Sequence, residues 1–129
     1  MPRPLPIALV LLLTGAPLAA HHWFSANFDG SRPFTMTGLV TKFAWTNPHV
    51  ALYLDVKDEK IGTRTAWMMD MGSPSSLTRL GWSKDSLEVG ETIVVEGIPS
   101  RDGSRVGYAY VVTVAATGRR LPAAPPRER

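Results

Sequence analysis

The segment 50–56 restricts the fold of this chain more than any other. Apolar side chains occupy every second position there, and small or polar side chains occupy the positions between them. Successive side chains of a β-strand point to opposite faces, so this period of two predicts a strand with one buried face. The apolar set is Val50, Leu52, Leu54 and Val56, and it alternates with Ala51, Tyr53 and Asp55.

The flanking segments extend this strand into an antiparallel pattern. Residues 34–45 are rich in Thr, Val and aromatic residues, and the turn sequence Thr46-Asn47-Pro48 joins them to the strand at 50–56, so we expect a hairpin. Gly38 inside the upstream strand predicts a bulge or a sharp bend. A third strand over 63–71 is expected after the polar turn at 57–62.

The C-terminal half of the chain adds one helix and two strands. Ser73-Pro74 is typical of a helix start, with Ser as the N-cap and Pro at the first helical position. The helix is expected over 75–80 and ends at Gly81. Strands are expected over 93–98 and 107–114, joined by a turn at 100–103.

This order of elements predicts an all-β fold, a small five-stranded OB-like barrel with one short helix between strands three and four. An open sandwich of five or six strands has the same strand order and is the alternative. The 129 residues provide for a single core. Because the chain has no cysteine, that core must be stabilised by packing, without a disulfide or a Cys-based zinc site.

Residues 1–20 have the order of a secretory signal peptide. One positive charge, Arg3, precedes the apolar run 7–13, and small residues follow at 15–20. The apolar run is shorter than the roughly 20 residues that a membrane-spanning helix needs. We therefore expect cleavage after Ala20, a mature chain that begins at His21, and a periplasmic or secreted protein without stable membrane insertion.

The rest of the chain divides into three parts by composition. An aromatic arm over 21–33 precedes the β-domain at 34–115, and the tail at 116–129 has the Gly, Pro, Ala and Arg content of a disordered segment. The net charge of +3 comes from the two ends, because residues 21–115 hold nine Lys or Arg against ten Asp or Glu. A near-neutral domain does not favour nucleic-acid binding.

Several short motifs point to a known family. In chain order they are HHWF at 21–24, FD at 28–29, WTNPH at 45–49, GSP at 72–74, RLGW at 79–82 and DSL at 85–87. Together they resemble the exported bacterial family catalogued as a domain of unknown function, DUF6152, over nearly all of 21–120. The resemblance implies export and a small β-domain, and it brings no established activity.

This chain departs from the family pattern in two places. The family usually has Ser where Trp23 stands, and Ala-Phe-Glu-Leu where residues 68–71 read Met-Met-Asp-Met. The acidic position is thus kept as Asp70. The methionines leave open whether this member shares every ligand of its relatives.

The three histidines form the main functional clue. His21 and His22 stand at the expected mature terminus, and His49 stands in the Asn-Pro-His turn. A freed N-terminal His offers its imidazole and its α-amino group, whose pKa is about 8, to one metal ion. His49 would add a third nitrogen, and nitrogen-rich sites of this kind favour Cu(II), with zinc or nickel as weaker contenders.

Other residues admit a functional and a structural interpretation. The histidines could equally be polar residues of a frayed end and a turn cap. Asp29 and Asp70 could bind the metal, orient an imidazole, or be solvated acids. Met68, Met69 and Met71 are soft Cu(I) ligands by type, but core packing is the simpler role for Met69 and Met71, which share a strand face. Trp45, Trp67 and Trp82 could line a cleft or fill the core.

The arm must return along the first hairpin to bring its terminus to His49. Extended, residues 21–33 could span about 40 Å, enough for that return. Trp23, Phe24 and Phe28 are the expected anchors of the arm on the barrel.

These features favour an exported binding module, with copper as the expected ligand and His21, His22, His49 and Asp70 as candidate metal residues. The alternative is a non-catalytic accessory domain that docks on a periplasmic partner protein. No catalytic motif stands out, so we expect no enzymatic activity.

Overall fold

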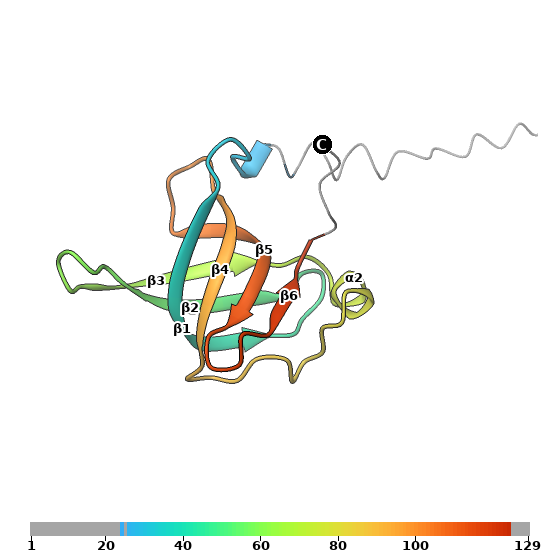
Figure 1. Ribbon diagram of the computed structural model, residues 1–129. Helices are drawn as coiled ribbons and strands as arrows, with labels where there is room; N and C mark the ends of the chain where they lie inside the picture. The colour runs from blue at the N-terminus through green and yellow to red at the C-terminus, as the bar shows by residue number, and fades with distance from the viewer. Residues whose placement is uncertain (1–23, 25, 125–129) are drawn as a thin grey trace, which may run out of the picture.

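The computed structural model describes residue 24 and residues 26–124, and they fold mostly into strands. Figure 1 shows a small barrel of strongly curved strands with a short helix at one end. The elements are β1 (Phe34–Ala44), β2 (Ala51–Lys57), β3 (Arg64–Asp70), α2 (Pro74–Arg79), β4 (Thr92–Pro99), β5 (Val106–Val114) and β6 (Arg120–Pro122).

Five strands close into a barrel. The sheet order is β3-β2-β1-β4-β5-β6, and every neighbouring pair is antiparallel. A parallel pairing of Met68–Asp70 with Val106–Tyr108 joins β3 to β5 and completes the ring. With α2 between β3 and β4, this is the predicted OB-like barrel, and closure rules out the open sandwich.

The local sequence signals act as expected, with one shift. Ser73 is the N-cap of α2, and its side chain accepts a hydrogen bond from the Ser76 amide. The irregularity predicted at Gly38 lies instead between Val40 and Lys42, while Gly38 itself keeps regular register with both neighbours. A bulge lets β1 bend sharply while it pairs with β2 and β4.

The core lies inside the barrel and contains the predicted apolar positions. Of the four apolar residues of the alternation at 50–56, Val50, Leu52 and Leu54 are buried and Val56 is partly buried against the core. Leu77 of α2 is also fully buried, so the helix packs onto one end of the core. Met69, Met71 and Trp82 are core residues as well. The strands expected over 93–98 and 107–114 add the buried residues Ile93, Val95, Val112 and Val114.

The tail corrects the expected domain boundary. Disorder was expected from residue 116, but residues 120–122 form β6 on the free edge of β5, and Ala123 is buried. The Trp82 indole donates a 2.7 Å hydrogen bond to the Pro122 carbonyl. A buried indole N–H requires such an acceptor. Leu121 is partly buried against the core and adds an apolar contact, which the Gly, Pro, Ala and Arg content of the tail did not indicate. Residues 125–129 lie outside the described part.

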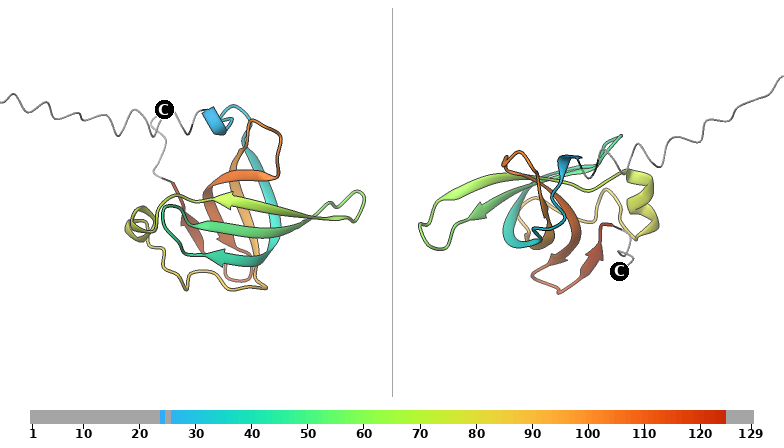
Figure 2. Two further views of the ribbon diagram at one scale, coloured as in Figure 1. Left: turned by 180° about the vertical axis from the view of Figure 1, so that it is seen from behind. Right: turned by 90° about the horizontal axis from the view of Figure 1, so that it is seen from above.

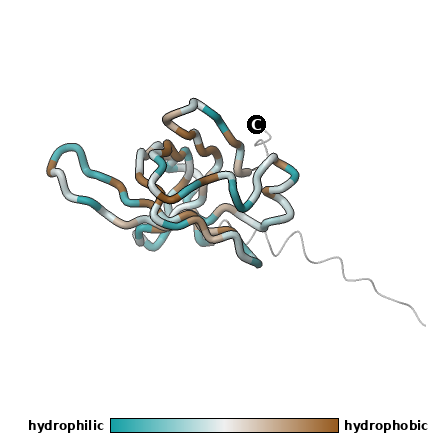
Figure 3. The backbone as a smooth tube through the Cα atoms, turned by 90° about the horizontal axis from the view of Figure 1, so that it is seen from below, coloured by the Kyte–Doolittle hydropathy of each residue, from teal (hydrophilic) through white to brown (hydrophobic). Residues whose placement is uncertain are grey.

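The β2–β3 hairpin projects away from the barrel (Figures 1 and 2). Its turn is mostly hydrophilic in Figure 3. Ile61, which belongs to this turn, is 71% exposed. Within the described residues, the structure contains no helix that is long and apolar enough to cross a membrane.

Candidate metal centre

His49 lies in the connection between β1 and β2, next to the end of β3. The Asn47–Pro48 peptide bond before it is cis. The Thr46 hydroxyl donates to the His49 carbonyl at 3.2 Å, and the Val50 amide donates to the Gly72 carbonyl at 2.7 Å. The first bond closes the turn within the β1–β2 connection, and the second fixes the backbone after His49 against the segment that follows β3.

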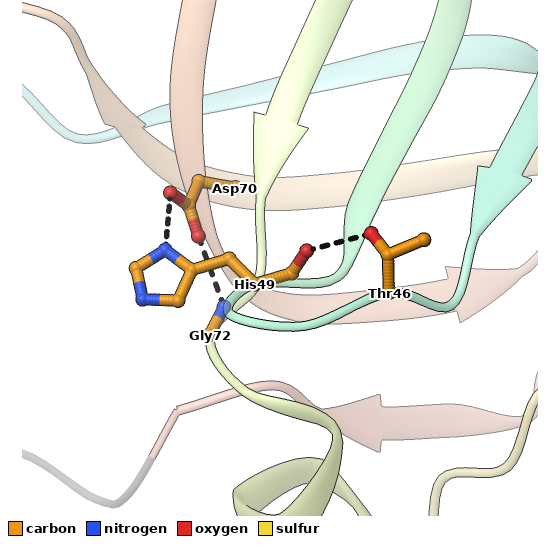
Figure 4. Close-up of polar contacts among 4 residues, drawn as sticks. All are labelled: Thr46, His49, Asp70 and Gly72. Atoms are coloured by element: carbon orange, nitrogen blue, oxygen red, sulfur yellow. Dashed lines mark hydrogen bonds and ion pairs between the residues drawn. The ribbon is translucent and has the colours of Figure 1, made fainter.

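The imidazole of His49 pairs with the carboxylate of Asp70, the last residue of β3 (Figure 4). His49 Nδ1 and Asp70 Oδ2 are 2.9 Å apart, and the other carboxylate oxygen accepts the Gly72 amide at 3.0 Å. The side chain of Asp70 is 14% exposed and that of His49 is 40% exposed. Asp70 is thus a sheltered carboxylate that holds a more accessible imidazole.

Gly72 gives the carboxylate its second donor. Its φ of +90° is a backbone conformation that side chains rarely adopt. A Cβ at this position would also lie 3.3 Å from the Tyr108 hydroxyl and 3.4 Å from Ser76 Oγ. The turn between β3 and α2 therefore requires glycine here to direct its amide at Asp70.

Tyr108 on β5 borders the pair. It is the register partner of Asp70 in the parallel pairing that closes the barrel. Burial raises the pKa of Tyr108 to about 12, and the negative charges of Asp70 and Tyr110 act in the same direction. The phenol is therefore neutral at ordinary pH.

The aromatic arm packs on Tyr108, as the anchor prediction required. The rings of Phe24 and Tyr108 meet edge to face at 4.9 Å, and Phe28 lies 5.6 Å from Tyr108 with 4% exposure. The Asn27 carbonyl accepts the Arg101 amide, which ties the arm to the β4–β5 loop. Both segments lie side by side in Figures 1 and 2. Trp23, the third expected anchor, lies outside the described residues.

The structure therefore brings together only part of the predicted site. His49 and Asp70 meet, while His21 and His22 lie outside the described residues. Asp29 accepts bonds from the amide and hydroxyl of Ser31, and these bonds hold the pKa of Asp29 below its usual value. Across residue 24 and residues 26–124, no group of three or more His, Asp or Glu is arranged to hold a metal ion.

Sequence reasoning missed Gly72 and Tyr108. The sequence indicated Gly72 only as part of a family motif and the helix start only at Ser73-Pro74, although a glycine before an N-cap also signals an unusual backbone position. Tyr108 reaches Asp70 through the parallel β3–β5 pairing. That contact depends on barrel closure and leaves no trace in the local sequence.

A separate groove of about 560 Å³ lies on the outer face at the other end of β2 and β3. It is lined by threonines of β1 and β4 and by charged residues of the projecting hairpin. Two of these charges, Asp55 and Arg64, pair with each other at 3.2 Å. Neither His49 nor Asp70, the two described candidate metal residues, lines this groove.

The fold and the site define a small OB-like β-barrel that carries a carboxylate-held histidine beside a docked N-terminal arm. The chain belongs to the family of unknown function DUF6152, which matches residues 9–109. The matched segment includes His21, His22, His49, Asp70 and Tyr108. No curated protein matches the chain.

Proposed function

We propose that this protein is an exported binding module that holds one Cu(II) ion at its mature amino terminus. The ligands are the α-amino and imidazole nitrogens of His21 and the imidazole of His49, with His22 as an alternative donor. Asp70 orients His49. Signal cleavage after Ala20 creates the amino-terminal donor, and binding, with no catalysis, is the role of the site.

The contact between His49 and Asp70 carries this proposal. Metal-binding histidines usually donate one ring N–H to a carboxylate, which fixes the ring and makes the other nitrogen more basic. With the proton of the neutral ring on Nδ1, His49 donates to Asp70 at 2.9 Å, and Nε2 carries the lone pair for a metal. Both oxygens of Asp70 are engaged, so orientation suits this residue better than direct ligation.

The path of the arm supports the same site. Phe24 contacts Tyr108, and Tyr108 is paired in register with Asp70. Three residues separate the start of the mature chain from this contact, a length that spans at most about 10 Å. The amino group of a chain that starts at His21 would therefore lie within about 10 Å of Phe24, whose ring contacts the tyrosine paired with Asp70.

The donor chemistry selects the metal. Amino and imidazole nitrogens without thiolates suit Cu(II), which stands at the top of the affinity order for divalent ions of the first transition row. The chain has no cysteine that could favour zinc or Cu(I) by thiolate binding. Met69 and Met71 are fully buried in the core, which fits packing better than ligation.

The accessory-domain alternative receives less support. A docking role for the arm would need aromatic side chains that are free to contact another protein. Phe28 is buried against this chain's own barrel, however, and Phe24 packs on Tyr108.

Copper titration of the mature protein tests the proposal. We expect one Cu(II) per chain that starts at His21, with nitrogen coupling in its electron paramagnetic resonance spectrum. His49→Ala and a form with one extra residue before His21 should both bind much more weakly, because each removes one part of the nitrogen set. Asp70→Asn should weaken binding by about 10- to 100-fold. Asp55→Asn, on the outer face away from the site, is the matched control.

The extended form is decisive because it keeps every side chain and moves only the amino group. If it bound copper as tightly as the mature protein and gave the same spectrum, the amino-terminal site would be wrong. A mature protein that binds no copper would favour the accessory-domain role instead.

A further inference from the structure

We propose that the groove between β1 and the projecting β2–β3 hairpin binds an extended peptide segment of another protein. The segment adds a strand to the open edge of residues 34–37 and places a carboxylate at Lys57. This site does not depend on the proposed copper function, because neither His49 nor Asp70 lines the groove.

The open edge results from the way β1 changes partners. β1 pairs with β4 over Phe34–Leu39, but its register with β2 begins only at Gly38, opposite Val56. β2 then follows β3, and Lys57 pairs with Arg64 in the hairpin that projects from the barrel (Figures 1 and 2). The first four residues of β1 therefore have a partner strand on one side only.

The backbone groups of Thr35 and Thr37 face this open edge. The Val40 amide donates to the Glu91 carbonyl at 2.9 Å, and the Val40 carbonyl accepts the Gly90 amide at 2.8 Å, so Val40 faces the β4 side. Every second residue of a strand directs its backbone groups to the same side, and the residues between them face the other side. Unpaired groups along a strand edge are a template for a further strand.

The groove beside this edge has the size and the lining for an added strand. Its volume is about 560 Å³, and it is lined by Met36 and Val56, which are partly buried against the core. A strand of four residues is about 13 Å long. The edge therefore suits a short segment that sets one apolar side chain against Met36 and Val56. Its polar side chains would meet the exposed threonines of the groove, Thr35, Thr37 and Thr92.

The charges of the groove favour a carboxylate on the peptide. Asp55 and Arg64 pair with each other at 3.2 Å, which leaves Lys57 and Glu59. Within the described part of the chain, Lys57 takes part in no ion pair. It is the last residue of β2, where the hairpin leaves β1, whereas Glu59 lies two residues further into the turn. The charge nearest to the open edge is thus positive, and an acidic residue complements it.

The short edge favours a peptide over a second copy of this chain. A stable interface between two proteins buries about 800 Å² on each partner. Strand pairing over about 13 Å falls short of that area. A peptide needs less, because main-chain hydrogen bonds supply its affinity and the pockets for alternate side chains supply its specificity.

Selection of random heptapeptides displayed on phage against the purified protein tests this inference. We expect the selected peptides to alternate apolar and polar residues and to carry Asp or Glu near one end. A synthetic peptide of the leading sequence should bind Lys57→Glu about tenfold more weakly than the parent, measured by fluorescence anisotropy. Thr35→Pro removes an amide at the open edge and spares the ladder with β4, so it should have a similar effect. Thr35→Val keeps that amide and is the matched control.

Methylation of the peptide backbone is a second test, and it leaves the protein unchanged. Two peptides carry N-methyl groups on alternate residues, in the two possible phases. Only one of them should lose binding, because an added strand turns only one edge toward β1. His49→Ala should bind the unmethylated peptide like the parent, which separates this site from the copper site.

Three outcomes would overturn the proposal. The first is a selection that enriches no peptide. The second is a peptide that binds equally well in both methylated phases, or equally well to Thr35→Pro. The third is a parent that dimerises while Thr35→Pro stays monomeric, since the edge would then belong to a second copy.

Discussion

At the end of β3, the carboxylate of Asp70 joins three segments of the chain. It bonds the imidazole from the β1–β2 connection and the Gly72 amide ahead of α2, and it lies opposite Tyr108 on β5. Burial raises the pKa of Tyr108, and the neighbouring Asp70 carboxylate raises it further, so the phenol stays neutral at ordinary pH.

This arrangement predicts how the stability of the protein falls in alkali. The pKa of Tyr108 rises from its ordinary value of 10.0 to about 12 in the folded chain, chiefly through burial. A raised pKa means that the folded state holds the proton more tightly, so its contribution to stability is complete below pH 10 and is lost as the pH rises to about 12. In the Tyr108→Phe variant, the free energy of unfolding should therefore fall less than in the parent as the pH rises from 10.0 to about 12.

The measurement is urea unfolding of both proteins at a series of pH values across that window. Tyr53→Phe is the matched control, and it should follow the parent curve. A Tyr108→Phe protein whose free energy of unfolding fell as steeply as that of the parent would show that another group titrates.

At the scale of single elements, the sequence predicted the strands well and their irregularities poorly. The alternation at 50–56 and the Ser73-Pro74 start produced boundaries within one residue of β2 and α2, because both signals are local. The register shift between Val40 and Lys42 lies just past Leu39, where the β1–β4 register ends, and this tertiary arrangement is not visible in the local sequence. β6 was missed because three residues carry no period, and their pairing depends on β5 and Trp82.

The residues of the candidate site were likewise only partly predictable from the sequence. The sequence drew attention to His49 and Asp70 by residue type and motif, and their contact follows from the adjacent ends of β2 and β3. Tyr108 and Gly72 could not be foreseen as members. One depends on the β3–β5 closure, and the other depends on a turn conformation with positive φ.

Trp82 and β6 should depend on each other for stability. Trp82→Phe keeps most of the buried ring but removes the donor to the Pro122 carbonyl, so we expect a loss of about 1 kcal/mol in the full chain. In a chain that ends at Gly118, which lacks β6, the same substitution should cost clearly less. Denaturant unfolding of the four proteins gives the coupling energy directly. Equal costs in both backgrounds would mean that this hydrogen bond does not hold β6.

At the scale of the whole molecule, the barrel is stabilised by one apolar core and by close contact between strands. Leu52 is fully buried at the centre of the predicted alternation. Leu52→Ala should lower the free energy of unfolding by about 2 to 5 kcal/mol, through lost transfer energy and the cavity that remains. Ile61→Ala, at the exposed tip of the hairpin, is the control and should change it little. An unchanged melting temperature for Leu52→Ala would contradict the packing described above.

Barrel closure itself should be most sensitive at Gly97. This glycine lies on β4 opposite Ala109, just after a register shift, and a Cβ there would overlap the carbonyl oxygen of Tyr108. The obstacle is backbone, which cannot move aside without disturbing β5 at the point where Tyr108 also pairs with Asp70 of β3. We therefore expect Gly97→Ala to disrupt the pairing that closes the ring and the His49–Asp70 contact together. Amide hydrogen exchange should show early loss of protection in β3 and β5. Gly38→Ala is the milder comparison, because the nearest atom to its added Cβ is a Val56 side-chain methyl at 3.2 Å. Wild-type protection in Gly97→Ala would mean that β4 and β5 lie further apart than this packing requires.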